Sequence, residues 1–193
     1  MSSSRLEAFS DGVLAVIITI MVLELKVPDG HEWSDLHSTG ISFLTYLLSF
    51  VYVGIYWNNH HHMFQLVERT DGLVLWANLH LLFWLSLFPF TTAWLDESRV
   101  AEAPAVLYGA DLLAAAVAYF LLQLAIFRVP GGDQLRQALG MDWKGKLSPV
   151  LYLIGIGLAF VSPRTAMVPM VIVALVWLVP DRRLERYVAG RRV

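Results

Sequence analysis

The chain has 193 residues, of which 57% are apolar and 16% are charged, and it contains no cysteine. A soluble domain of this length cannot bury so many apolar side chains while presenting so few charges to water, which indicates an integral membrane protein. The lack of cysteine excludes disulfides, thiolate metal sites and a cysteine nucleophile. A formal net charge of −2 excludes a broadly basic nucleic-acid-binding protein.

Apolar stretches bounded by charged residues predict an all-α protein with six membrane-spanning helices. About 20 apolar residues, rising about 1.5 Å each, cross a hydrocarbon core of about 30 Å. The first stretch lacks a small-x-small cleavage site, so we interpret it as a span and not as a signal peptide. Short connections leave no room for a soluble domain, and residues 1–193 are expected to form one transmembrane domain. The expected spans are Phe9–Val27, Ser38–Val67, Gly72–Leu95, Ala103–Phe127, Leu147–Pro163 and Thr165–Pro180.

The basic residues predict the orientation of these spans. With both termini in the cytoplasm, eleven of the 14 basic residues lie inside and only Lys26, Arg99 and Arg164 lie outside. This distribution follows the positive-inside rule and supports an even number of spans. The opposite side collects acidic residues, which form a solvated loop face and would also concentrate cations there.

Three ionisable residues, Asp11, His80 and Asp111, lie at membrane depth in this topology. Each costs about 2.5 to 3.5 kcal/mol to insert, so each is a candidate functional group. The structural alternative for Asp111 is a buried hydrogen bond between helices, and for His80 it is a satisfied core histidine. Both interpretations remain open at this point.

The triplet His60–His61–His62 invites a metal-site interpretation. Consecutive helical residues point about 100° apart and cannot converge on one ion, so we expect a polar surface at the inner end of the second span and no metal. The sequence also lacks a serine nucleophile elbow, a glycine-rich phosphate loop and an HExxH motif, so it predicts neither an enzyme nor a bound cofactor.

The first span opens with Arg5-Leu-Glu-Ala-Phe9-Ser10-Asp11, which reads RxxxFSD, and continues into the apolar segment Gly12–Leu23. Together with LFPF at Leu87–Phe90 and the six-span plan, this motif resembles the transmembrane protein 175 family of potassium channels. The resemblance implies a cation channel whose first helix lines the pore. Its constriction would consist of large aliphatic side chains, and the sequence has no TVGYG-like carbonyl filter.

Val16, Ile20 and Leu23 fall on one stripe of the first helix, with Thr19 beside it. Periodicity alone favours an ordinary packing face, whereas the resemblance assigns these positions to the pore constriction. The Thr19 hydroxyl has two interpretations: it bonds back to a helix carbonyl, or its oxygen contacts a partly dehydrated cation.

Asp11 precedes Val16 by five residues, hence lies about 140° around the helix and points away from the proposed pore. We expect it to fix the first helix to its neighbours. The residues expected in this network are Arg5, Phe9, Ser10, Asp11 and His80.

In the family that the chain resembles, members with two six-span repeats assemble as pairs. The resemblance therefore implies that this chain, which has a single RxxxFSD copy, surrounds one pore as a homotetramer. The favoured function is therefore a potassium-selective channel of a prokaryotic plasma membrane, with K⁺ as the permeant ion. The alternative is a proton-coupled secondary transporter that uses Asp11, His80 and Asp111 as carriers.

Overall fold

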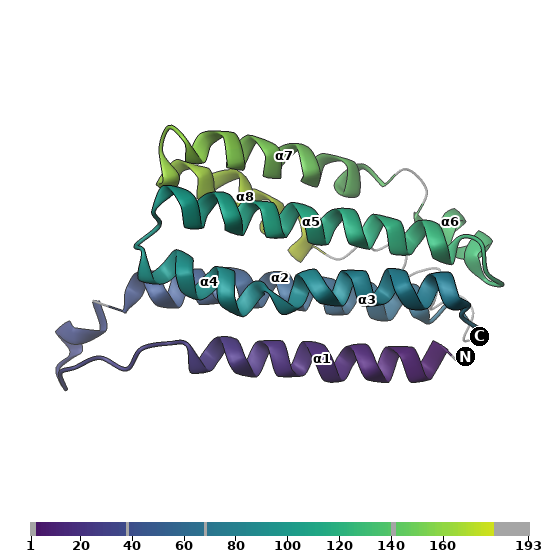
Figure 1. Cartoon of the computed structure of the whole chain (residues 1–193), viewed down its shortest axis with the longest axis horizontal. Helices are drawn as coiled ribbons and strands as arrows, with labels where there is room; N and C mark the ends of the chain where they lie inside the picture. Colours follow the sequence, from purple (N-terminus) through teal and green to yellow (C-terminus); the bar gives the residue numbers. More distant parts are fainter. Residues whose placement is uncertain (1–2, 38, 68, 140–141, 180–193) are drawn as a thin grey trace.

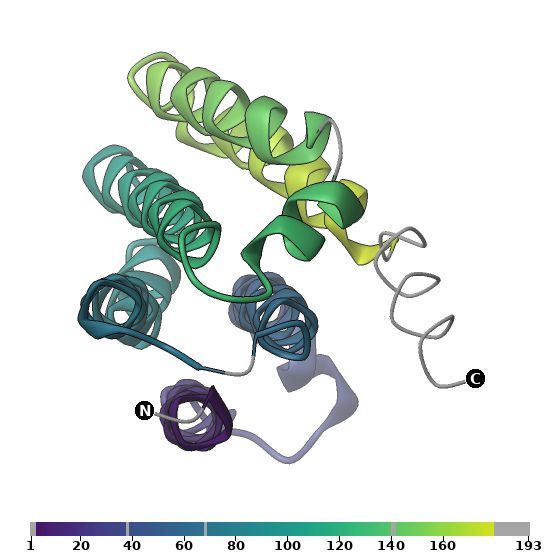
Figure 2. The same cartoon turned by 90° about the vertical axis from the view of Figure 1, so that its right-hand side faces the viewer.

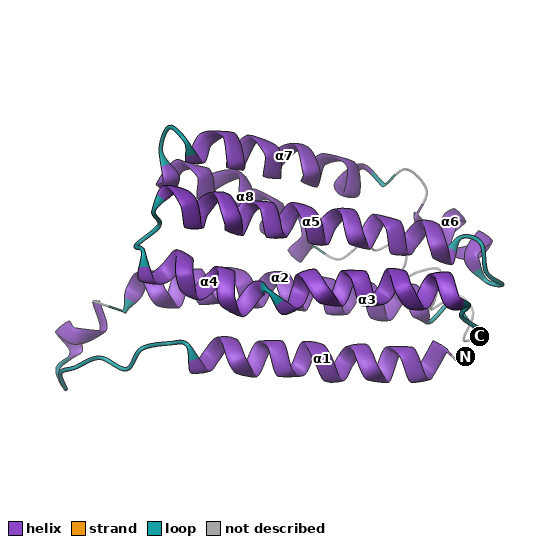
Figure 3. Cartoon of the chain, in the orientation of Figure 1, coloured by secondary structure: helices purple, strands orange, loops and turns teal. Residues whose placement is uncertain are grey.

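The computed structural model describes residues 3–37, 39–67, 69–139 and 142–179. The regular structure of these residues is helical, and they contain no β-strand (Figure 3). The helices, in chain order, are α1 (Ser3–Leu23), the short 3₁₀ helix η1 (Trp33–His37), α2 (Gly40–Phe64), α3 (Gly72–Ser86), α4 (Phe88–Glu97), α5 (Glu102–Ile126), α6 (Gly132–Leu139), α7 (Trp143–Ala159) and α8 (Pro163–Leu178).

The long helices lie side by side along one axis (Figure 1). Within the described ranges, four stretches are long and apolar enough to cross a membrane: α1, α2, the Gly72–Glu97 stretch that joins α3 and α4, and α5. Helices α7 and α8 are shorter, with 17 and 16 residues. At 1.5 Å per residue they are about 24 to 26 Å long, so α7 is at the lower limit of about 17 residues for a transmembrane helix and α8 is just below it. The expected six spans are therefore not all found among the described helices.

The first helix differs from its expected bounds at both ends, because α1 runs from Ser3 to Leu23 and not from Phe9 to Val27. Charged residues such as Arg5 mark where a segment leaves the hydrocarbon, but they do not end a helix, whose backbone hydrogen bonds continue into water. At its other end the helix stops at Leu23, several residues before Pro28. Pro28 has no amide hydrogen and could not continue the backbone hydrogen bonds of the helix.

The third expected span is two helices. Leu87 separates α3 from α4, and its backbone N–H bonds to the carbonyl of Trp84 at 3.0 Å in a tightened last turn. Pro89 follows at the start of α4 and has no amide hydrogen to continue the ladder. The LFPF segment therefore interrupts the helix, and α3 and α4 are two separate helices.

Helix α6 occupies a segment that the sequence predicted to be a simple connection. It crosses the end of the bundle at which α1 begins (Figure 2). Leu135 is 1% exposed and anchors α6 in the core, while Arg136 on the next position is exposed. An eight-residue amphipathic pattern is too short to stand out from a polar loop by periodicity.

Helix α5 is central and contacts α3, α4, α7 and α8, whereas α1 lies at the edge and contacts α2, α3 and α4. Buried alanines on α5, among them Ala105, Ala115 and Ala118, let neighbouring backbones approach closely. In the end view, α1 and α7 lie on opposite sides of the bundle (Figure 2). Helix α1, which carries the predicted pore residues, is thus packed against the rest of the chain on one side only.

Candidate functional site

Helix α1 has two different faces. Its buried face consists of Leu6, Ser10, Leu14, Ile17 and Met21, which recur every three or four residues and form one stripe. The residues predicted to line a pore lie outside this stripe: Val16 is 55% exposed, Ile20 is 42% exposed and Leu23 is 80% exposed. One copy of the chain therefore leaves a large apolar surface of α1 uncovered.

A buried chain of hydrogen bonds fastens α1 to α2 and α3. His60 Nε2 lies 2.8 Å from Asn78 Oδ1, and because an amide oxygen only accepts, the imidazole donates. Asn78 Nδ2 donates to Ser10 Oγ at 3.0 Å, and Ser10 Oγ donates to the carbonyl of Leu6 at 2.9 Å. All three side chains are at most 2% exposed. We call His60, Asn78 and Ser10 the polar relay.

Two further contacts join α1 to α2 alongside the relay. Trp57 Nε1 donates to Asp11 Oδ1 at 3.0 Å. Glu7 Oε1 pairs with His61 Nδ1, while the other ring nitrogen of His61 accepts from Gln65 Nε2 at 2.7 Å. An amide nitrogen only donates, so the His61 proton lies on Nδ1 and points at the carboxylate. Two carboxylates of α1 thus face α2, away from the exposed aliphatic stripe.

Thr19 is exposed beside that stripe, and its hydroxyl donates to the carbonyl of Val16 at 2.8 Å. The hydroxyl hydrogen is therefore satisfied within the helix, the first of the two interpretations considered for this residue. The oxygen lone pairs remain on the exposed side.

A second polar cluster lies deeper in the bundle, around α4 and α5. Thr91 Oγ1 donates to Asp111 Oδ2 at 3.0 Å, and Asp111 is 3% exposed. On the neighbouring position, Thr92 Oγ1 donates to Ser49 Oγ at 2.7 Å, and Ser49 in turn lies 3.0 Å from the hydroxyl of Tyr108. Asp111 forms the buried hydrogen bond between helices that was its structural alternative.

Three comparisons place the chain among known proteins. The family model described as "Endosomal/lysosomal potassium channel TMEM175" matches residues 5–89. A Chryseobacterium sp. (strain P1-3) protein named a potassium channel is 51% identical over 187 residues, which cover 96% of this chain and 97% of the relative. The chain belongs to the TMEM175 family.

Two more similar proteins are a bacterial one of known structure and a human one. The crystal structure of a lysosomal potassium-selective channel TMEM175 homolog from Chamaesiphon minutus has a TM-score of 0.78 and 33% identity, covering 93% of this chain and 97% of that chain. The Homo sapiens protein named endosomal/lysosomal proton channel TMEM175 is 37% identical over 82 residues, 36% of this chain and 16% of the human protein. These relatives are named channels and not enzymes.

Of the residues predicted in the motif network of this TMEM175 chain, some contact neighbouring helices and others are exposed. Ser10 binds Asn78 on α3, and Asp11 binds Trp57 on α2. Arg5 and Phe9 are exposed instead. His80 is also exposed and accepts from Trp84 Nε1, one turn along its own helix, at 3.0 Å. The prediction of His80 as a core histidine beside Asp11 is wrong, because α3 turns Asn78, two positions earlier, toward α1.

Sequence reasoning missed four partners: Glu7, Trp57, His60 and Asn78. Asn78 is neutral and so does not stand out among the ionisable groups of the spans, although a lone amide in an apolar span is itself a signal for inter-helix bonding. His60 was expected on a polar inner surface but is buried at 2% exposure. Within the described residues, no group of three potential ligand side chains could hold a metal ion.

Proposed function

We propose that the chain is the subunit of a potassium channel and that α1 lines the pore. Two relatives named potassium channels match 96% and 83% of its length. The observation that carries the proposal is the two-faced α1: hydrogen bonds hold one side against α2 and α3, and the aliphatic stripe of Val16, Ile20 and Leu23 is left uncovered.

The stripe supplies a physical mechanism for selection. Rings of aliphatic side chains offer no oxygen ligands, so a permeating cation must lose part of its hydration shell, which costs less for K⁺ than for the more strongly hydrated Na⁺. The same rings can close the path by dewetting. Thr19, whose oxygen lies beside the stripe, would offset part of the dehydration cost.

The proposed assembly is a homotetramer with six spans per subunit: α1, α2, α3 with α4, α5, α7 and α8. Four α1 helices around one axis would cover the exposed stripe, which one chain leaves open. Both termini would lie in the cytoplasm, in agreement with the positive-inside distribution, and the membrane would be a prokaryotic plasma membrane.

A proton-coupled transporter is less well supported. Its three proposed carriers each bind a separate partner: Asp11 binds Trp57, His80 binds Trp84, and Asp111 binds Thr91. These pairs lie on different helices and form no continuous chain of hydrogen bonds among the described residues. Because the human relative is named a proton channel, proton current belongs in the test.

The test is recording from the full-length protein in planar bilayers, with K⁺ opposing Na⁺ and with a pH gradient. Discrete unitary currents that reverse near the K⁺ potential are expected. Val16→Ala and Ile20→Ala should shift the reversal potential toward zero, because a wider and wetter constriction demands less dehydration.

Matched control variants exist on the outer helices. Val150 on α7 is 51% exposed and Ile172 on α8 is 42% exposed, close to the values for Val16 and Ile20. Val150→Ala and Ile172→Ala should leave selectivity unchanged. Equal selectivity in all four variants would remove the pore assignment of α1, and the absence of unitary currents in the wild-type protein would remove the channel.

A further inference from the structure

A groove of about 380 Å³ opens on the side of the bundle between α5 and the start of α7. The small residues Ala116 on α5 and Gly145 on α7 are part of its lining. Phe120 and Val117 form its apolar wall on α5, where they are 55% and 44% exposed, and Pro149 faces them from α7.

Two bases lie at the mouth of the groove, Arg136 on α6 and Lys146 on the first turn of α7. Both are exposed, and no described residue forms an ion pair or hydrogen bond with either side chain. The carboxylate at the mouth, Asp142, is already used, because it accepts from the backbone N–H of Gly145 at 2.8 Å and caps α7. The mouth therefore carries a net positive charge.

The charges and the apolar wall are arranged in a definite order. The bases lie at the end of the bundle where α1 begins, and the apolar wall continues from them along α5 and α7. A phospholipid has the same order, with its phosphate at the membrane surface and its acyl chains along the helices. Basic pockets between membrane helices are suited to anionic lipid headgroups.

We infer that this groove binds one anionic phospholipid per subunit, with its phosphate on Arg136 and Lys146 and an acyl chain against Val117 and Phe120. The position fits a lipid-facing site, since α7 lies on the opposite side of the bundle from α1 (Figure 2). The inference does not depend on ion conduction, because lipid binding is measured without a current.

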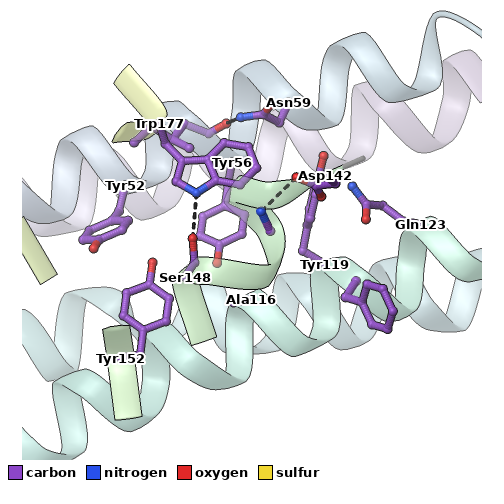
Figure 4. Close-up of a pocket in the computed structure, with 13 residues that line it drawn as sticks. Tyr52, Tyr56, Asn59, Ala116, Tyr119, Gln123, Asp142, Ser148, Tyr152 and Trp177 are labelled. Atoms are coloured by element: carbon purple, nitrogen blue, oxygen red, sulfur yellow. Dashed lines mark hydrogen bonds between the residues drawn. The ribbon is translucent and has the colours of Figure 1, made fainter. Parts of the chain in front are cut away.

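A smaller cavity, drawn in Figure 4, adjoins the groove and shares Ala116, Phe120 and Gln123 with its lining. Its volume is about 50 Å³, and Tyr52, Tyr119, Gln123 and Trp177 contribute to its lining. A water molecule needs about 10 to 15 Å³ in such a measure, so this cavity holds a few waters and not an acyl chain. The acyl chain therefore stays in the groove, against Phe120 and Val117, and does not enter the smaller cavity behind Gln123, which borders both spaces.

The test is native mass spectrometry of the purified full-length protein with added phosphatidylglycerol or phosphatidylcholine of identical acyl chains. The wild-type protein should retain phosphatidylglycerol preferentially, at one molecule per subunit. In the double variant Arg136→Gln/Lys146→Gln, retention should fall about 30-fold, since each base near a membrane surface contributes about a factor of five. Lys146→Gln alone should give about a fivefold loss.

The matched control is Arg69→Gln/Arg128→Gln, which removes two exposed bases from the same end of the bundle but outside the groove. It should bind phosphatidylglycerol like the wild-type protein. An equal loss in both double variants would show diffuse attraction to that end and would overturn the inference. Displacement of the lipid by equimolar glycerol 3-phosphate would show a free-phosphate site and would overturn it as well.

Discussion

Removing the amide of Asn78 should destabilise the protein more than any other single amide substitution near α1. Asn78 on α3 is fully buried and connects α3 to α1 and α2. Its Oδ1 accepts from His60 on α2, and its Nδ2 donates to Ser10 on α1. In Asn78→Ala both partners lose their bond, and neither can turn to water. The size of the destabilisation depends on which hydrogen bonds His60 and Ser10 retain in the variant.

His60 loses the one side-chain hydrogen bond that it makes with the described residues, because its Nδ1 is buried and has no partner among them. In the variant Nε2 also becomes an unsatisfied buried donor, which costs about 1 to 3 kcal/mol. Ser10 keeps its bond to the Leu6 carbonyl, so its loss is closer to the average for an inter-helix bond in a membrane, about 0.6 kcal/mol. We expect Asn78→Ala to lower the free energy of unfolding by about 2 kcal/mol in total.

The measurement is reversible unfolding of the detergent-solubilised protein, with Asn59→Ala as the matched control. Among the residues that the structure describes, Asn59 Nδ2 donates only to the carbonyl of Ile55 on its own helix, at 2.8 Å. Its removal should cost less than about 0.5 kcal/mol. If Asn78→Ala and Asn59→Ala were equally stable, the polar relay would not be what fastens α1.

Two further predictions concern α1 itself. Asp11→Ala and Trp57→Phe should each destabilise the protein, with a coupling of about 1 kcal/mol in a double-mutant cycle and unchanged reversal potentials; stable protein with altered selectivity would mean that Asp11 faces the ion. Thr19→Val should leave the unfolding free energy within about 0.5 kcal/mol of wild type, because the bond it loses is local, and should lower the K⁺ conductance; equal conductance would show that Thr19 is only a helix residue.

Helix positions followed from hydropathy where a span was long and uninterrupted. The expected spans Ser38–Val67 and Ala103–Phe127 contain or nearly equal α2 and α5. The direction of Asp11 relative to Val16 also followed from the 100° turn per residue, because it depends on one helix alone. Such properties are local, and a single sequence specifies them.

The partners across helices could not be predicted in the same way. Whether α3 presents Asn78 or His80 to α1 depends on the rotation of α3 about its own axis, and its helix is apolar on every side. Hydropathy then gives no preferred face. The LFPF break has the same character: Pro89 predicts that the helix is disturbed, but the direction in which α4 leaves depends on packing against α5.

The undefined rotation of an apolar helix also explains why α1 carries polar residues. In a bilayer, an apolar helix gains little from burying one apolar face over another, since lipid is as good a partner as protein. Apolar contacts alone would let α1 rotate. The bonds of Ser10 to Asn78, Asp11 to Trp57 and Glu7 to His61 are directional, and a rotation by one residue, about 100°, would break all of them. Fixing the rotation of α1 also fixes which aliphatic side chains remain uncovered, so the polar residues determine the composition of the proposed pore without facing it.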